Sequence, residues 1–110
     1  MKLVRLDEVP LSPVSHDPGL MKKVLFGPGA LPHLDAVSHI EFRAGDRASA
    51  HRHEDGHEVL FCVRGKMEVV VDGNPVTLSE GGCLVVEPGE AHSIERAEEG
   101  SRLFYFRVRG

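Results

Sequence analysis

Residues 57–95, HEVLFCVRGKMEVVVDGNPVTLSEGGCLVVEPGEAHSIE, decide the fold class of this chain. Within them, short runs rich in valine, leucine and phenylalanine are separated by turn sequences that contain glycine. β-Branched and aromatic residues favour strands, whereas Gly, Pro, Asn and Asp favour turns. No window shows the 3.6-residue apolar stripe of a helix. The stretch therefore predicts a succession of short β-strands.

The same pattern continues outward on both sides of this stretch, with turn signals at Ala44-Gly45-Asp46 and Glu99-Gly100. Short strands spaced at roughly 8–12 residues are typical of β-sandwiches and closed barrels. We therefore predict an all-β sandwich or barrel over residues 36–110. The expected strands are Val37–Arg43, His57–Arg64, Lys66–Val71, Val76–Leu78, Cys83–Val86, His92–Glu95 and Leu103–Val108.

Residues 1–35 differ from the rest, because they contain five of the seven prolines. Proline fixes φ and removes a backbone donor, so long strands are not expected there. We predict an irregular N-terminal arm over residues 1–35, with at most a short strand around Lys23–Phe26. This arm would wrap the barrel or exchange with a partner subunit. A chain of 110 residues suffices for one core and one domain.

Composition excludes several classes of partner. The formal net charge is −4, and no cluster of lysine and arginine offers the concentrated positive face that nucleic acid requires. No stretch approaches the length of a membrane span, and residues 1–9 do not form a signal peptide, so we expect a cytoplasmic protein. Cys62 and Cys83 lie in apolar runs without a Cys-x-x-Cys pair, and we expect both to be buried free thiols.

Histidine is the residue type that points to a site, with seven copies in the chain. His51 and His53 are two residues apart, so on a strand they share a face, with Cα atoms about 6.6 Å apart. Two such imidazoles can converge on one transition-metal ion. Taken singly, His16, His33 and His39 are expected at the surface or as hydrogen-bonded core residues.

Glu58 is a third candidate ligand, although an uninterrupted strand would place it on the opposite face from His53. The turn signal Asp55-Gly56 lies between them. A two-residue reversal there would pair His53 with Glu58, and a corner that crosses to an opposing sheet would bring the same groups together from two sides. His57 is the alternative ligand, and it would complete a set of histidines alone.

His92 is the fourth candidate ligand. It opens the strand that follows the turn at Pro88-Gly89. A ligand at the start of a strand, directly after a fixed turn, is held rigidly, as a metal site requires.

The spacing of these residues resembles that of the cupin family. The stretch Gly45-(x)5-His51-x-His53-(x)4-Glu58-(x)6-Gly65 resembles the first cupin motif, and Gly81-(x)6-Pro88-Gly89-Glu90-Ala91-His92 resembles the second. The chain departs from the second motif at two positions, where Glu87 replaces a proline and Arg96 replaces an asparagine. The resemblance implies a jelly-roll barrel, the conserved β-barrel of cupins. It also implies that His51, His53, Glu58 and His92 bind one divalent metal ion: iron, manganese, nickel, zinc or copper.

The function implied by the resemblance is broad. It includes metal-dependent dioxygenases, isomerases and lyases that act on a small organic substrate, and it equally includes non-catalytic modules that bind or sense a small ligand. Tyr105 is the candidate catalytic residue, because an inward Tyr105 or Arg107 could orient an acidic substrate. The alternative is that Tyr105 fills the core and the arginines face solvent. Residues 15–25 resemble those of small bacterial cupins, which form homodimers through their N-terminal strands.

Overall fold

Ten β-strands and one short 3₁₀ turn make up the chain, and there is no α-helix. The computed structural model describes residues 1–110. The elements are η1 (Leu6–Glu8), β1 (Leu11–Val14), β2 (Asp17–Phe26), β3 (Leu34–Glu41), β4 (Ala48–Arg52), β5 (His57–Arg64), β6 (Lys66–Val71), β7 (Asn74–Ser79), β8 (Cys83–Val86), β9 (Ala91–Ala97) and β10 (Arg102–Val108).

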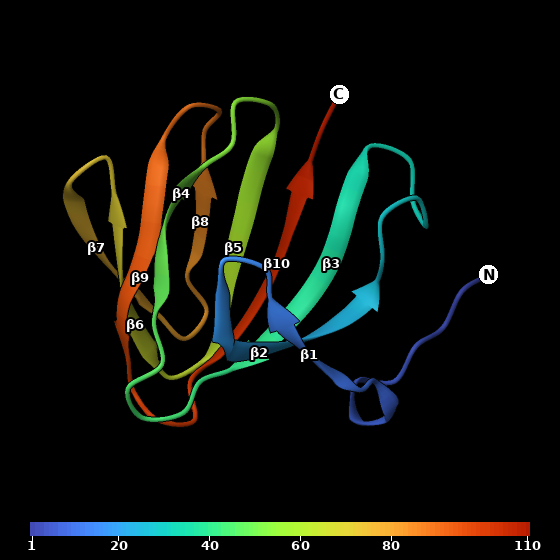
Figure 1. Cartoon of the computed structure of the whole chain (residues 1–110), viewed down its shortest axis with the longest axis horizontal. Coiled ribbons are helices and arrows are strands. Elements are labelled where there is room, and N and C mark those ends of the chain that lie inside the picture. Colours follow the sequence, from blue (N-terminus) through green and yellow to red (C-terminus); the bar gives the residue numbers. More distant parts are fainter.

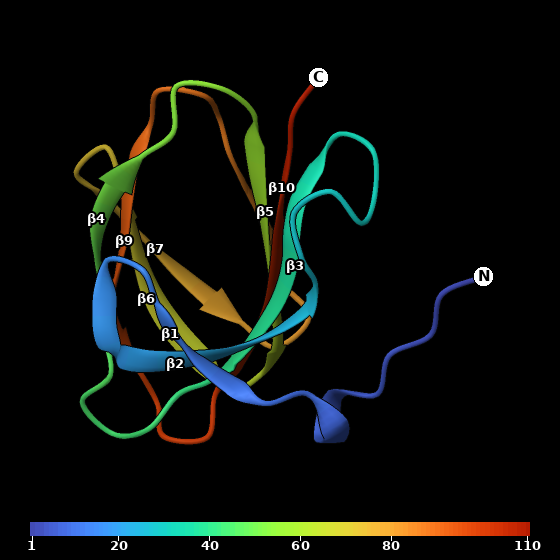
Figure 2. The same ribbon diagram turned by 45° about the vertical axis from the view of Figure 1, so that its right-hand side comes forward.

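The strands form two sheets that face each other in a jelly-roll barrel (Figure 1). The six-stranded sheet has the order β1-β2-β3-β10-β5-β8, and the four-stranded sheet has the order β4-β9-β6-β7. All strand pairs are antiparallel. The all-β jelly-roll prediction is therefore confirmed. Figure 2 shows the barrel from a second side, with the β1–β2 hairpin crossing beside β4.

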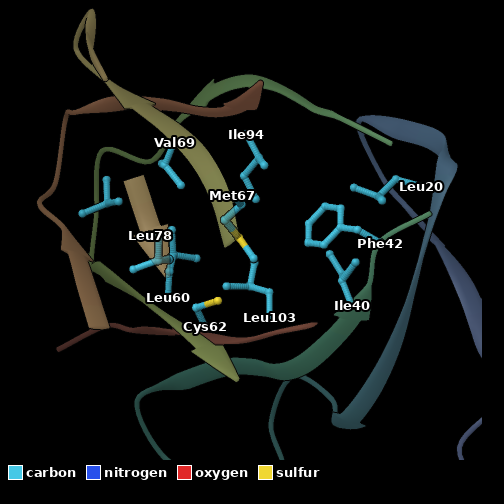
Figure 3. Close-up of a cluster of buried hydrophobic side chains, with 11 residues drawn as sticks. Leu20, Ile40, Phe42, Leu60, Cys62, Met67, Val69, Leu78, Ile94 and Leu103 are labelled. Carbon is cyan, nitrogen blue, oxygen red and sulfur yellow. The ribbon is translucent and has the colours of Figure 1, made fainter. Parts of the chain in front are cut away.

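The core lies between the sheets and follows from strand alternation. On β5, Leu60 and Cys62 point inward, while Phe61 and Val63 between and beside them are exposed. Figure 3 shows how the buried side chains from both sheets meet. They are Leu20, Ile40, Phe42, Leu60, Cys62, Met67, Val69, Leu78, Val86, Ile94 and Leu103. This cluster fixes the two sheets relative to each other.

The predicted strands agree with the structure for β5, β6 and β8, whose bounds are identical to those expected. The observed β7 and β9 begin and end beyond their apolar centres, because backbone pairing continues past the apolar residues. The strand β4, with sequence ASAHR, was not among the expected apolar runs. Its pairing with β9 makes it a strand in spite of its polar composition.

The prediction of an irregular arm is wrong for residues 11–26. They form the hairpin of β1 and the ten-residue β2, which pairs with β3 and so extends the six-stranded sheet. Pro13 is tolerated because β1 is the edge strand, where a missing backbone donor removes no bond to a further strand. Leu20 anchors β2 in the core with only 2% of its surface exposed. The expected strand at Lys23–Phe26 is the end of β2.

The cysteine prediction holds for one residue. Both cysteines are free, but only Cys62 is buried, and Cys83 is exposed. Cys83 pairs with Phe61 across β5 and β8, on the outward face of the sheet. No helix of the structure is long and apolar enough to cross a membrane.

Candidate metal centre

Three strands and one connection bring the four candidate ligands together inside the barrel. His51 on β4 lies directly opposite His92 on β9, in the four-stranded sheet. Glu58 is the second residue of β5 in the other sheet. His53 lies in the connection between β4 and β5. One ligand atom from each of the four residues can be chosen such that all lie within 4.8 Å of one another.

The β4–β5 connection is a corner between sheets and not a hairpin, because β4 and β5 belong to different sheets. The two-residue reversal considered for Asp55-Gly56 is therefore wrong, and the crossing to an opposing sheet is confirmed. Gly56 makes the corner possible with a φ of 87°. A Cβ atom at this position would lie 2.6 Å from the carbonyl oxygen of Val108. The corner thus requires glycine for its backbone angle and for its space.

The rings and the carboxylate are close enough to share one ion. The ring centroid of His51 lies 4.2 Å from that of His92 and 4.9 Å from that of His53. Nε2 of His92 lies 2.7 Å from Oε2 of Glu58, and Nε2 of His53 lies 3.6 Å from the same oxygen. Three imidazoles and one carboxylate form a donor set that accepts a divalent transition metal.

The burial of Glu58 and His92 leaves polar atoms that a cation would satisfy. Glu58 and His92 are 8% and 5% exposed, respectively. Within hydrogen-bond distance, Oε2 of Glu58 and Nε2 of His92 have no partner other than each other. Buried polar atoms are almost always satisfied, so two such atoms aimed at one point fit a metal ion or a shared proton. The residues therefore fit the group that the sequence predicts.

Electrostatics keep most of the set ready for a metal. Burial lowers the pKa of His51 and of His53, which favours the neutral imidazoles that metals bind. Burial opposes the charge of Glu58, but the hydrogen bond with His92 and the nearby histidines lower its pKa below the ordinary value. Burial likewise opposes the charge of His92, but Glu58 outweighs it and raises the pKa of His92. A metal would replace the proton that this pair shares.

His57, the alternative to Glu58, lies outside the cluster. It is exposed, and its Nε2 lies 2.8 Å from Oε2 of Glu87. Glu58 points inward because it precedes the buried Leu60 and Cys62 by an even number of residues on β5. The parity of β5 therefore separates two neighbouring residues that local sequence did not distinguish.

A cavity of about 260 Å³ adjoins the cluster and is lined by residues of both sheets. Tyr105 and Arg107 on β10 both line it, so the alternative in which the arginines face solvent does not apply to Arg107. Arg107 forms an ion pair with Asp35 and contacts Nδ1 of His53. Burial, together with the charge of Glu58, raises the pKa of Tyr105 to about 12. Tyr105 therefore keeps its proton at neutral pH, and its hydrogen-bond partner Ser38 also lines the cavity.

Sequence reasoning missed part of the cavity wall. His16, treated singly as a surface or core residue, stacks on His51 with ring centroids 5.4 Å apart. Asp35 and Lys22 also line the cavity. The resemblance of residues 15–25 to small bacterial cupins covers His16 and Lys22, but it assigned neither of them to a site, and no motif covers Asp35. A further sequence signal was the spacing of Leu20 and Lys22, which places both residues on one face of a strand. The prolines of this region argued against a strand, so this signal was not used.

Fold and site together define a class of protein, a two-sheet β-barrel that encloses a candidate metal site of three histidines and one glutamate. The chain belongs to the Cupin_2 family: the family model, described as a cupin domain, matches residues 38–106. The recognition of a small cupin from its motif spacing is thus confirmed.

Individual relatives have been named for different activities. The chain is 30% identical over 66 residues to quercetin 2,3-dioxygenase from Bacillus subtilis, in a match that covers 60% of this chain and 20% of that protein. It is 28% identical over 64 residues to the pectin degradation protein KdgF from Dickeya dadantii, which covers 58% of each chain. The chain thus spans between one fifth and three fifths of the length of these relatives.

A solved structure shows the same fold over the whole chain. The crystal structure described as that of a predicted oxalate decarboxylase from Thermotoga maritima gives a TM-score of 0.89 and covers 99% of this chain and 100% of that chain. The sequence identity is 19%, so this likeness concerns the fold. The N-terminal hairpin falls within the shared architecture, since nearly all of both chains superpose.

Proposed function

We propose that this protein is a metal-dependent enzyme that acts on a small organic substrate. The observation that carries the proposal is the cluster of His51, His53, Glu58 and His92 at the wall of a cavity of about 260 Å³. These four residues would hold a metal ion at the cavity wall, and a position on the metal that stays accessible distinguishes catalytic from structural metals. A divalent ion held there would supply Lewis-acid or oxygen-activating chemistry.

The chain's own residues have separable tasks in this proposal. The three histidines and Glu58 hold the ion. Tyr105 is the proposed catalytic residue, since it lines the cavity and keeps its proton. Such a hydroxyl stabilises a negative oxygen that develops on the substrate. Leu60, Leu103 and Ile94 line the cavity with apolar surface, which excludes water from the substrate.

The proposed reaction type is that of a dioxygenase, an isomerase or a lyase, and a relative's name directly supports the first of these. One curated relative is named as a dioxygenase and another as a pectin degradation protein. The ligand set does not discriminate among iron, manganese, nickel, zinc and copper, because all of them accept imidazole and carboxylate. We therefore propose the metal centre with its reaction class and leave the metal to measurement.

Two measurements test this proposal. Metal analysis of protein purified without an affinity tag should give one transition-metal ion per chain, and the double variant His51→Ala/His53→Ala should contain none. Unchanged metal content in the double variant would refute the site. Oxygen uptake with small aromatic and keto-acid substrates, compared between wild type and Tyr105→Phe, then tests turnover. The Tyr105→Phe variant should retain its metal and lose most of its activity.

The second candidate function is a non-catalytic module that binds or senses a small ligand through its metal. One observation favours it: the raised pKa of Tyr105 makes that residue a poor general base. A metal-loaded protein that binds a small acid reversibly, and leaves it chemically unchanged, would support this function over catalysis.

A further inference from the structure

The β1–β2 hairpin forms one wall of the cavity beside the candidate metal centre. Six of its residues line the cavity: Val14, Ser15, His16, Asp17, Leu20 and Lys22. In Figure 2 the hairpin lies next to β4, and β2 runs from there across the barrel to β3. Any molecule in the cavity therefore lies between the metal ligands and the N-terminal hairpin.

The tip of the hairpin is fixed beside the metal ligands. The ring of His16 stacks on that of His51 with an interplanar angle of 29°. Next to it, the carboxylate of Asp17 accepts hydrogen bonds from the backbone N–H and the hydroxyl of Ser49, at 3.0 and 2.8 Å. Arg43 donates a further hydrogen bond to the carbonyl of Gly19 at 2.7 Å. These tethers join the hairpin to β4 and to the β3–β4 connection, so it forms a positioned wall.

Lys22 is a cavity cation without a neutralising partner. It shares a strand face with the buried Leu20, whereas the neighbouring Lys23 donates its ammonium to the carbonyl of Leu6. Lys22 forms no ion pair in the structure, unlike Arg107, which is paired with Asp35. A half-buried lysine that lines a cavity without a counter-ion favours an anionic ligand.

The sign of the cavity charge depends on the metal. Without an ion, the charged lining residues Asp17, Lys22, Asp35, Glu58 and Arg107 give a slight negative excess. A divalent ion reverses this to a positive excess. The small cavity volume, just below the roughly 300–1,000 Å³ of ordinary small-molecule pockets, restricts the ligand to a compact molecule.

We propose that the N-terminal hairpin supplies two ligand-contacting residues, Lys22 and His16, that select a compact organic dianion. One acidic end of the ligand would bind the metal near His16, which stacks on His51, and the carboxylate at the other end would meet Lys22. This inference rests on the proposed metal centre. It assigns substrate selection to a segment outside the residues matched by the family model, 38–106.

The test uses Co²⁺-loaded full-length protein and its visible absorption as a report of ligands on the metal. Two keto-acid pairs of matched length serve as probes: 2-oxoglutarate against 2-oxopentanoate, and oxaloacetate against 2-oxobutanoate. We expect at least one dianion to bind at least tenfold more tightly than its monoacid. Lys22→Met should abolish this preference without weakening the monoacid. Lys23→Met, which removes the same charge from the next residue of the strand, should retain it.

His16→Ala should weaken both members of each pair at least threefold with unchanged Co²⁺ content, while the exposed control His57→Ala should not. Equal affinities for dianion and monoacid in the wild type would overturn the inference, as would a preference that persists in Lys22→Met. Wild-type affinities in His16→Ala would remove His16 from it. A protein that takes up no Co²⁺ would instead refute the metal centre, and the inference with it.

Discussion

Substitution of Gly56 by alanine tests whether the corner between the sheets sets the geometry of the metal centre. Gly56 directly precedes β5, between His53 and Glu58, and has a φ of 87°. A left-handed backbone costs a residue with a Cβ about 1–2 kcal/mol. The new Cβ would also lie 2.6 Å from the carbonyl oxygen of Val108, so either β10 or the corner must move. Such overpacking adds about 1–3 kcal/mol.

Gly73 provides the matched control, because its φ is 79° and a Cβ there would meet no atom within 4 Å. Gly73→Ala should show the backbone cost alone. At about 4 °C of melting temperature per kcal/mol for a domain of this size, we expect a decrease of about 4–8 °C for Gly73→Ala and about 8–20 °C for Gly56→Ala.

Metal affinity separates the local effect from general destabilisation. A displaced corner moves His53 and Glu58 apart, and a metal site tolerates only small errors in ligand position. We expect Gly56→Ala to bind Co²⁺ or Zn²⁺ at least tenfold more weakly than wild type in calorimetric titration below both melting temperatures. Gly73→Ala should bind like wild type. Equal melting temperatures or equal metal affinities in the two variants would refute this account of the corner.

Three further predictions concern other parts of the molecule. Glu58→Gln keeps the shape of the side chain but removes its charge, so we expect metal affinity to fall by about 100-fold or more in calorimetric titration; an unchanged affinity would exclude Glu58 as a ligand. His39 is 7% exposed, and burial lowers its pKa below the ordinary value of 6.5. Below pH 6.5 the unfolded chain therefore binds more protons at His39 than the folded chain does. The free energy of unfolding thus falls as the pH decreases through this value. Urea unfolding at pH 7.5 and pH 5 should show a smaller acid loss for His39→Gln than for wild type, and an identical loss would contradict the assignment. Leu11 is 60% exposed on the edge strand β1, in the N-terminal segment through which the homodimer is expected to form, so light scattering should show a dimer for wild type and a shift to monomer for Leu11→Lys; a monomeric wild type would refute it.

The local sequence was sufficient to predict many strands of the barrel, because a strand has a characteristic pattern of apolar and turn residues. Apolar alternation and turn dipeptides located β5, β6 and β8 to the residue. Prediction from the local sequence failed where pairing with a neighbouring strand outweighs the residue composition. The polar β4 is a strand because it pairs with β9. The strand β2 forms although Pro18 lies within it, because β3 offers it a partner and Leu20 enters the core.

The candidate ligands were accessible from the sequence for a similar reason. His51 and His53 follow strand periodicity, and the spacing of all four ligands resembles a known motif. The sequence favoured Glu58 through the turn signal at Asp55-Gly56 and kept His57 as the alternative. The structure separates them through the parity of β5, which places Glu58 in the cluster and His57 beside Glu87 at the surface.

The sequence by itself determined that this protein is a cupin barrel with a histidine-rich candidate metal site, because strand periodicity, turn residues and motif spacing are properties of short segments. Only the tertiary structure decided that the β4–β5 corner crosses between the sheets. It alone also decided that His16 and Lys22 face the cavity and that Arg107 bridges Asp35 and His53. These arrangements depend on which distant strands pair and in which register. That is a long-range outcome of packing two sheets around one core, and no single stretch of the chain encodes it.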